Sequence, residues 1–132
     1  PLGPPRGTYF SPDGPVLSPR VIGWMRANAI GELLVQPLRA VLTQRSNDAE
    51  FFPGLPKRWS LAFQVNETAA PTGRAAGALM WAGLANCYYW IDPASGLAGV
   101  YVTQVLPFAD RKALPLFYDV ERAAYEAFRP SH

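Results

Sequence analysis

The sequence contains a single cysteine, Cys87, and a single histidine, His132, which is its last residue. One cysteine cannot form a disulfide within the chain or build a cysteine-rich metal site. One terminal histidine leaves nothing from which to assemble a Ser-His-Asp triad or a histidine metal site. Disulfide scaffolds, metal centres and histidine-dependent hydrolases are therefore not expected, and neither is any cofactor.

Charge of one sign and long apolar runs are also scarce. Lysine and arginine total 12 against 10 acidic residues, which gives a net charge of +2, and the basic residues are scattered along the chain. A nucleic-acid partner is therefore not expected. The longest apolar runs, such as residues 75–85, are too short to span a bilayer, so a membrane is not expected either. The lone cysteine and the lack of a signal-peptide pattern favour a cytoplasmic setting.

A reactive serine can also be activated by a lysine three residues later, on the same helical face. No serine in this sequence is followed by lysine at that distance, and no tyrosine begins a Tyr-x-Asn sequence. The chain therefore lacks both the Ser-x-x-Lys and the Tyr-x-Asn element of lysine-dependent serine enzymes. Asp48 and Glu50 could be mistaken for a catalytic carboxylate pair, but side chains of this kind more often anchor a loop through hydrogen bonds.

What the sequence does contain is sufficient for one globular domain. Of its 132 residues, 49% are hydrophobic and 17% are charged, and 14 prolines with 11 glycines favour short elements. Residues 1–17 are predicted to form an irregular lead. Ser18 followed by Pro19 predicts the start of a short, half-buried helix that ends near Gly31.

Four later segments have the composition of β-strands separated by turns. They are residues 59–66, 75–83, 87–91 and 100–105. Consecutive strands with short connections pair antiparallel, so these segments predict a sheet of about four consecutive strands. A last helix is expected to begin near Leu114 and Pro115 and to lay an apolar stripe on the sheet. The predicted class is α+β, with the sheet packed by the short N-terminal helix and the C-terminal helix.

Three long strings resemble serine hydrolases related to class C β-lactamases, a group that includes the family VIII carboxylesterases. They are residues 46–59, 77–93 and 96–110, within a likeness that extends from Pro12 to Phe128. The resemblance covers only the C-terminal part of such a protein. It implies that residues 18–132 are the C-terminal portion of a β-lactamase-like domain, a partial form of the fold shared with transpeptidases and penicillin-binding proteins.

The resemblance also assigns a candidate site. In that family a motif of lysine, histidine or tryptophan, then any residue, then glycine lies on a strand beside the nucleophile. Trp81, Ala82 and Gly83 match it and would contact substrate, and the backbone N–H of Leu84 would complete the oxyanion hole. Trp81 replaces the cation of penicillin-processing relatives, which favours neutral esters over β-lactams. Without the resemblance, a tryptophan in such a strand indicates core packing.

Two functions remain open from the sequence. In the first, the chain is a C-terminal fragment or subunit of a serine hydrolase that is not catalytic alone. Its partner is then the missing N-terminal part, and the assembled form acts on a small ester. In the second, the chain is a non-catalytic binding or assembly module that uses an exposed sheet edge to pair with a second copy or another partner.

Overall fold

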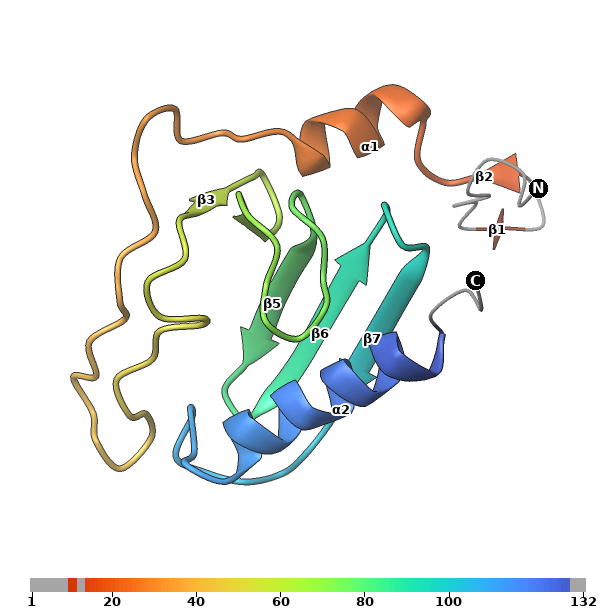
Figure 1. The fold of residues 1–132 in the computed structure, drawn as a ribbon. Coiled ribbons are helices and arrows are strands. Elements are labelled where there is room, and N and C mark those ends of the chain that lie inside the picture. The colour runs from red at the N-terminus through yellow and green to blue at the C-terminus, as the bar shows by residue number, and fades with distance from the viewer. Residues whose placement is uncertain (1–9, 12–13, 129–132) are drawn as a thin grey trace.

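A five-stranded antiparallel sheet, in the order β3-β4-β5-β6-β7, forms the body of the computed structural model, which describes residues 10–11 and 14–128 (Figure 1). The sheet strands are β3 (Lys57–Trp59), β4 (Gln64–Asn66), β5 (Leu79–Gly83), β6 (Cys87–Asp92) and β7 (Leu97–Tyr101). Helix α1 (Pro19–Arg26) precedes the sheet and helix α2 (Ala113–Ala127) follows it. Two helices and an antiparallel sheet confirm the predicted α+β class.

Aromatic packing between α2 and the sheet forms the centre of the core. Phe117 of α2 is fully buried and stacks on Tyr88 of β6, with ring centroids 4.9 Å apart. Trp90 lies beside the same helix, 5.9 Å from the Phe117 ring. A Cβ atom at Gly99 of β7 would come within 2.0 Å of the Trp90 ring, so only glycine fits there. Tyr88 and Trp90 therefore pack in the core.

A buried ion pair fixes α2 to the turn before β5. Both carboxylate oxygens of Glu121 accept hydrogen bonds from the guanidinium of Arg74, and both side chains are fully buried. The hydroxyl of Thr72 donates to the same carboxylate at 2.9 Å. Tyr125, one turn later, donates its hydroxyl to Asp92 at the end of β6. Apolar and polar contacts together therefore fix the position of α2 on the sheet.

The predicted number and bounds of the strands need correction. The predicted strand 59–66 is two strands, because Ser60 forms a turn between them in which its Oγ accepts from the N–H of Phe63 at 2.9 Å. Alternation of apolar and polar residues continues through this turn and concealed it. The predicted strand 75–83 begins only at Leu79, after a turn in which Gly77 has φ +81°. The predicted strand 100–105 is β7, at residues 97–101.

The prediction for the first helix is right about its start and its half-buried character, and wrong about its end. Ser18 caps α1 by accepting from the N–H of Val21 at 3.3 Å. The helix ends at Arg26 rather than near Gly31, because Asn28 forms a turn with its side chain bonded to Ile30 and Gly31. None of its residues is fully buried, Val21, Ile22 and Met25 are half buried, and Figure 1 shows the helix beside the strand ends.

The other predicted boundaries agree more closely with the structure. Helix α2 begins at Ala113, which leaves Pro115 in its first turn, where a proline is tolerated. Within the predicted lead, β1 (Phe10–Ser11) pairs with β2 (Gly14–Pro15), while residues 1–9 and 12–13 lie outside the described part, as does His132. Among the described residues, no helix has the length and apolar character needed to cross a membrane.

The two outer edges of the sheet are finished differently. The preceding segment runs along β3, where Ala29 donates to the carbonyl of Trp59 at 2.8 Å and Val35 donates to that of Lys57 at 2.9 Å. The guanidinium of Arg58 donates to the carbonyls of Gly31 and Leu33 in the same segment. At the opposite edge, no strand within residues 14–128 pairs with the outer side of β7.

Candidate functional site

The predicted site residues lie at the end of a strand that is paired on only one side. Trp81, Ala82 and Gly83 form the last part of β5, and each is paired with a residue of β6. On the other side, β4 reaches only Leu79 and Met80. The edge of residues 81–83 that faces away from β6 is therefore left without a strand partner in the described part of the chain.

Strand geometry also determines which amides face this open edge. Successive residues of an antiparallel strand direct their backbone groups to opposite neighbours. Ala78 accepts from the N–H of Asn66 on the β4 side, and Met80 pairs with Gln64 on the same side. Ala82 continues that series past the end of β4, and Leu84 follows it at the start of the turn. No partner is seen for the Leu84 N–H among the residues that the structure describes.

An aromatic wall flanks the open part of β5. The ring of Trp81 meets Trp59 edge-on at a centroid distance of 4.4 Å and Phe51 at 6.0 Å. Phe51 also contacts Tyr88, which lies on the other face of the sheet, so the loop that carries Phe51 passes beside the strand. Trp81 thus serves as packing and also presents an apolar surface next to the open edge.

Lys57 holds this loop in place. Its ammonium group is buried and donates to the carbonyls of Phe52 at 3.0 Å and Leu55 at 2.7 Å. Burial lowers the pKa of the Lys57 ammonium, and the carboxylate of Glu50 opposes this shift. Asp48 anchors the preceding loop, as predicted, by accepting from the N–H of Ala40 at 2.8 Å. Neither Lys57 nor Asp48 is placed to act on a substrate at the open edge.

Asn86 is a buried turn residue beside the candidate site that the sequence interpretation missed. It is fully buried, has φ +57°, and closes the turn between β5 and β6. Its amide donates to the carbonyls of Val105 and Pro107, each at 2.8 Å, and its carbonyl oxygen accepts from the hydroxyl of Tyr88 and the N–H of Asp110. Asparagine tolerates positive φ better than most residues, and this was the available signal. The turn that carries Leu84 is therefore held rigidly.

Cys87 follows this turn and is only half buried. Its Sγ lies 3.3 Å from the carbonyl oxygen of Thr103. The Thr103 hydroxyl in turn donates to the carbonyl of Ala85. Both contacts connect the turn to the segment after β7.

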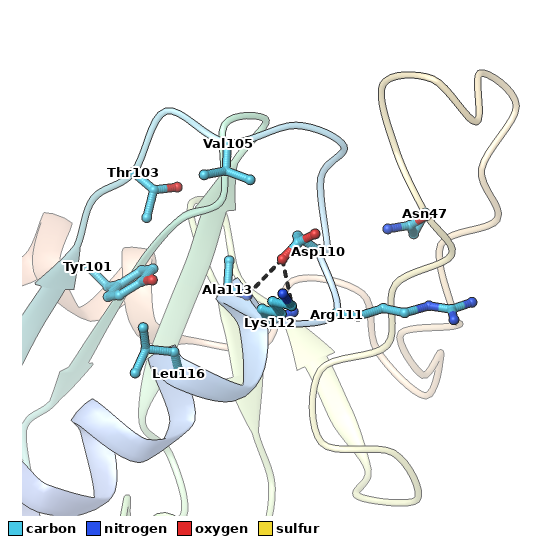
Figure 2. A pocket seen from close by; sticks show the side chains of 9 residues that line it. All are labelled: Asn47, Tyr101, Thr103, Val105, Asp110, Arg111, Lys112, Ala113 and Leu116. Atoms are coloured by element: carbon cyan, nitrogen blue, oxygen red, sulfur yellow. Dashed lines mark hydrogen bonds between the residues drawn. The ribbon is translucent and has the colours of Figure 1, made fainter.

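A groove of the described surface lies elsewhere. It has a volume of about 670 Å³ and lies between the segment after β7 and the start of α2 (Figure 2). Its lining residues are Asn47, Tyr101, Thr103, Val105, Asp110, Arg111, Lys112, Ala113 and Leu116. The Asp110 carboxylate caps α2 by accepting from the N–H groups of Lys112 and Ala113, and these bonds lower its pKa. None of the four predicted site residues lines this groove.

Within residues 10–11 and 14–128, no three histidine, cysteine, aspartate or glutamate side chains lie close enough to hold an ion. The open edge instead offers backbone amides and aromatic surface. Such an edge can donate a hydrogen bond to a developing negative charge, but it contains no nucleophile.

Comparison with known proteins supports the architecture. No family model matches the chain, and no curated protein matches it. Two solved structures of simvastatin synthase (LovD) from Aspergillus terreus do match, one of the LovD6 mutant and one of the unliganded selenomethionyl protein. Their TM-scores are 0.54 and 0.55, each at 24% sequence identity. The fold is β-lactamase-like.

The matched region is a small part of those structures. The alignments cover 56% and 58% of this chain, and 19% and 20% of the respective simvastatin synthase chains. This chain therefore spans about a fifth of the length of the structures that it matches. Identity at this level establishes the fold and leaves the activity to be argued from the residues.

Proposed function

We propose that this chain forms the oxyanion side of a β-lactamase-like serine hydrolase and is not catalytic alone. The observation that supports this proposal is the one-sided pairing of Trp81–Gly83, which leaves the series of amides that ends at Leu84 without a strand partner in the described part of the chain. In the interior of a sheet these groups would be used in a ladder. Here they remain available to a reacting oxygen.

The proposed reaction needs a serine from a second segment. Its Oγ attacks the carbonyl carbon of an ester, and the carbonyl oxygen gains the negative charge that the Leu84 N–H stabilises. The alcohol then leaves, and water releases the acid from the acyl-serine. A fixed amide donor contributes a few kcal/mol to such a barrier, roughly 100- to 1,000-fold in rate. The lysine that activates the serine also belongs to the second segment.

The aromatic wall supports a neutral substrate. Trp81 lies against Trp59 and Phe51, so the surface beside the open edge is apolar. Lys57 cannot supply a cation for a substrate carboxylate, because its ammonium is buried and already donates to two backbone carbonyls. A small carboxylic ester fits these surroundings better than an anionic β-lactam.

Co-expression tests the proposal. The chain is produced together with the Ser-x-x-Lys segment of its parent hydrolase, and p-nitrophenyl acetate hydrolysis is measured for each part and for the pair. Activity is expected only in the pair. Leu84→Pro removes the amide proton and should lower the rate roughly 100- to 1,000-fold, whereas Leu84→Ala keeps it and should fall far less. Equal rates for the two variants in a folded, assembled pair would overturn the role of Leu84.

A further inference from the structure

The proposed oxyanion donor, the N–H of Leu84, lies in the short loop between β5 and β6. Gly83 pairs with Cys87, so residues 84–86 form the hairpin loop. Three-residue hairpin loops commonly place their last residue in the left-handed region, and Asn86 has φ +57°. Leu84 is the first residue of the same loop. The direction of its N–H therefore depends on how this short loop is held.

The side chain of Asn86 uses its full hydrogen-bonding capacity. Its amide nitrogen donates to the carbonyls of Val105 and Pro107, each at 2.8 Å. Its carbonyl oxygen accepts from the hydroxyl of Tyr88 at 2.6 Å and from the N–H of Asp110 at 2.9 Å. A primary amide offers two N–H groups and one oxygen with two lone pairs. Because all of these are engaged and the side chain is fully buried, its orientation is fixed.

Most of these bonds reach the segment between β7 and α2, which is itself anchored. The Asp110 carboxylate accepts from the N–H groups of Lys112 and Ala113 at the start of α2. Thr103 of the same segment donates its hydroxyl to the carbonyl of Ala85 in the loop. The hairpin loop is thus bonded to the same part of the chain as the N-terminal end of α2.

We propose that Asn86 is a positioning residue of this site, which fixes the direction of the Leu84 N–H relative to the carbonyl oxygen of the bound ester. This inference rests on the proposed function and adds the residue on which the donor depends. A fixed donor stabilises the developing negative charge without reorienting during the reaction. A displacement of about 1 Å can cost roughly 100-fold in rate. Asn86 is fully buried, so it acts through the backbone of the loop and not on the substrate.

A purely structural role of Asn86 predicts a different result, and Asn66 supplies the matched control. Asn66, at the end of β4, is also buried, and its amide likewise donates to two carbonyls, those of Thr68 at 2.6 Å and Ala75 at 2.8 Å. Its backbone N–H bonds to Ala78, at the opposite end of β5 from Leu84. Loss of the Asn66 side chain therefore removes bonds of the same kind, away from the oxyanion donor.

Steady-state kinetics tests the inference on the chain assembled with the Ser-x-x-Lys segment, with p-nitrophenyl acetate as substrate. Asn86→Gly removes the side-chain bonds, while glycine readily keeps the positive φ. It should lower kcat about ten- to 100-fold and leave KM nearly unchanged, because the donor acts on the transition state. Asn66→Gly should lower the melting temperature of the assembled protein to a similar degree and leave kcat unchanged.

A double variant tests whether Asn86 acts through Leu84. Adding Asn86→Gly to Leu84→Pro should lower kcat little further, because the amide proton that Asn86 orients is already absent. Asn86→Asp serves if Asn86→Gly does not fold, since aspartate tolerates positive φ and keeps the accepted bonds but loses both donated ones. It should lower kcat about tenfold.

Failure of this inference is distinguishable from failure of the proposed function. Leu84→Pro and Leu84→Ala may differ as expected while Asn86→Gly and Asn66→Gly change kcat alike; Asn86 is then not a positioning residue. Independent, multiplying effects of Asn86→Gly and Leu84→Pro would overturn the inference in the same way. Equal rates for Leu84→Pro and Leu84→Ala would instead overturn the proposed function, and this inference with it.

Discussion

The two outer edges of the sheet have opposite surroundings. At β3 the chain covers its own edge, with backbone bonds from Ala29 and Val35 and a guanidinium that reaches two carbonyls. At β7 the outer side is uncovered in the described residues, while α2 buries the face beneath it. The β3 side is therefore stabilised mainly by polar contacts along the strand, and the β7 side by apolar contacts across the sheet.

This comparison matters for function because two strands of the sheet, β5 at its end and β7 along its outer side, lack a partner in the described residues. The end of β5 is paired on one side only, and β7 is paired on one side only. An unpaired strand edge is a binding surface for another strand or a donor to a ligand. At β3, by contrast, residues 29–35 of the same chain cover the edge through backbone hydrogen bonds.

The largest effect is expected from the helix that supports β7. Phe117→Ala removes a fully buried ring that stacks on Tyr88, and should lower the free energy of unfolding by about 3–5 kcal/mol. Denaturant unfolding measures this change. The matched control is Leu116→Ala, which alters the neighbouring, half-exposed residue of the same helix and should change stability by less than about 0.5 kcal/mol. Similar losses of stability in both variants would mean that packing of α2 does not specifically stabilise the β7 side of the sheet.

A smaller effect is expected at the covered edge. Arg58→Met keeps much of the aliphatic stem but leaves the carbonyls of Gly31 and Leu33 without their donor. The loss should be about 1–2 kcal/mol, because these acceptors are near the surface and water can replace part of the bond. Amide exchange at Ala29 and Val35 should accelerate locally, while exchange in β6 should be unchanged. Uniform acceleration would show that the covering segment is not a separate unit.

The same comparison explains what the sequence could predict. Strands β5 and β6 and helix α2 carry local signals: a small apolar run in β5, an aromatic run in β6, and in α2 a proline near the helix start with an apolar stripe that includes Phe117. The turn at Ser60 was hidden because its residues continue the alternation of the flanking strands. The covering of β3 depends on bonds between residues 29–35 and 57–59, and no local pattern encodes such a pairing.

The candidate site likewise combines features that local sequence predicts with features that depend on distant pairing. Strand composition and the family resemblance were enough to place Trp81–Gly83 on a strand and Leu84 after it, and the structure has them there. One-sided pairing was not predictable, because it depends on where β4 ends. Asn86 was not singled out, because its four hydrogen bonds reach residues that are distant in the sequence or outside the motif.

The smallest effect is expected at a contact between α2 and the loop that precedes β3. Tyr118 of α2 accepts a hydrogen bond from the N–H of Phe52 in the loop that precedes β3, and burial raises the pKa of its hydroxyl to about 12 from 10.0. The unfolded chain then releases this proton at a lower pH than the folded chain. Stability from this group is full below pH 10 and is lost as the pH rises toward 12.

Tyr118→Phe tests this linkage. The free energy of unfolding of the variant should fall less steeply between pH 9 and pH 11 than that of the unmodified chain, on the order of 1 kcal/mol or less at the upper limit. Burial also raises the pKa of Tyr88 and Tyr125, and burial lowers that of Lys57, which has the opposite effect on stability. These groups are present in both proteins, so the difference between the two curves isolates Tyr118. Parallel curves would show that the loop and α2 are not coupled through this hydroxyl.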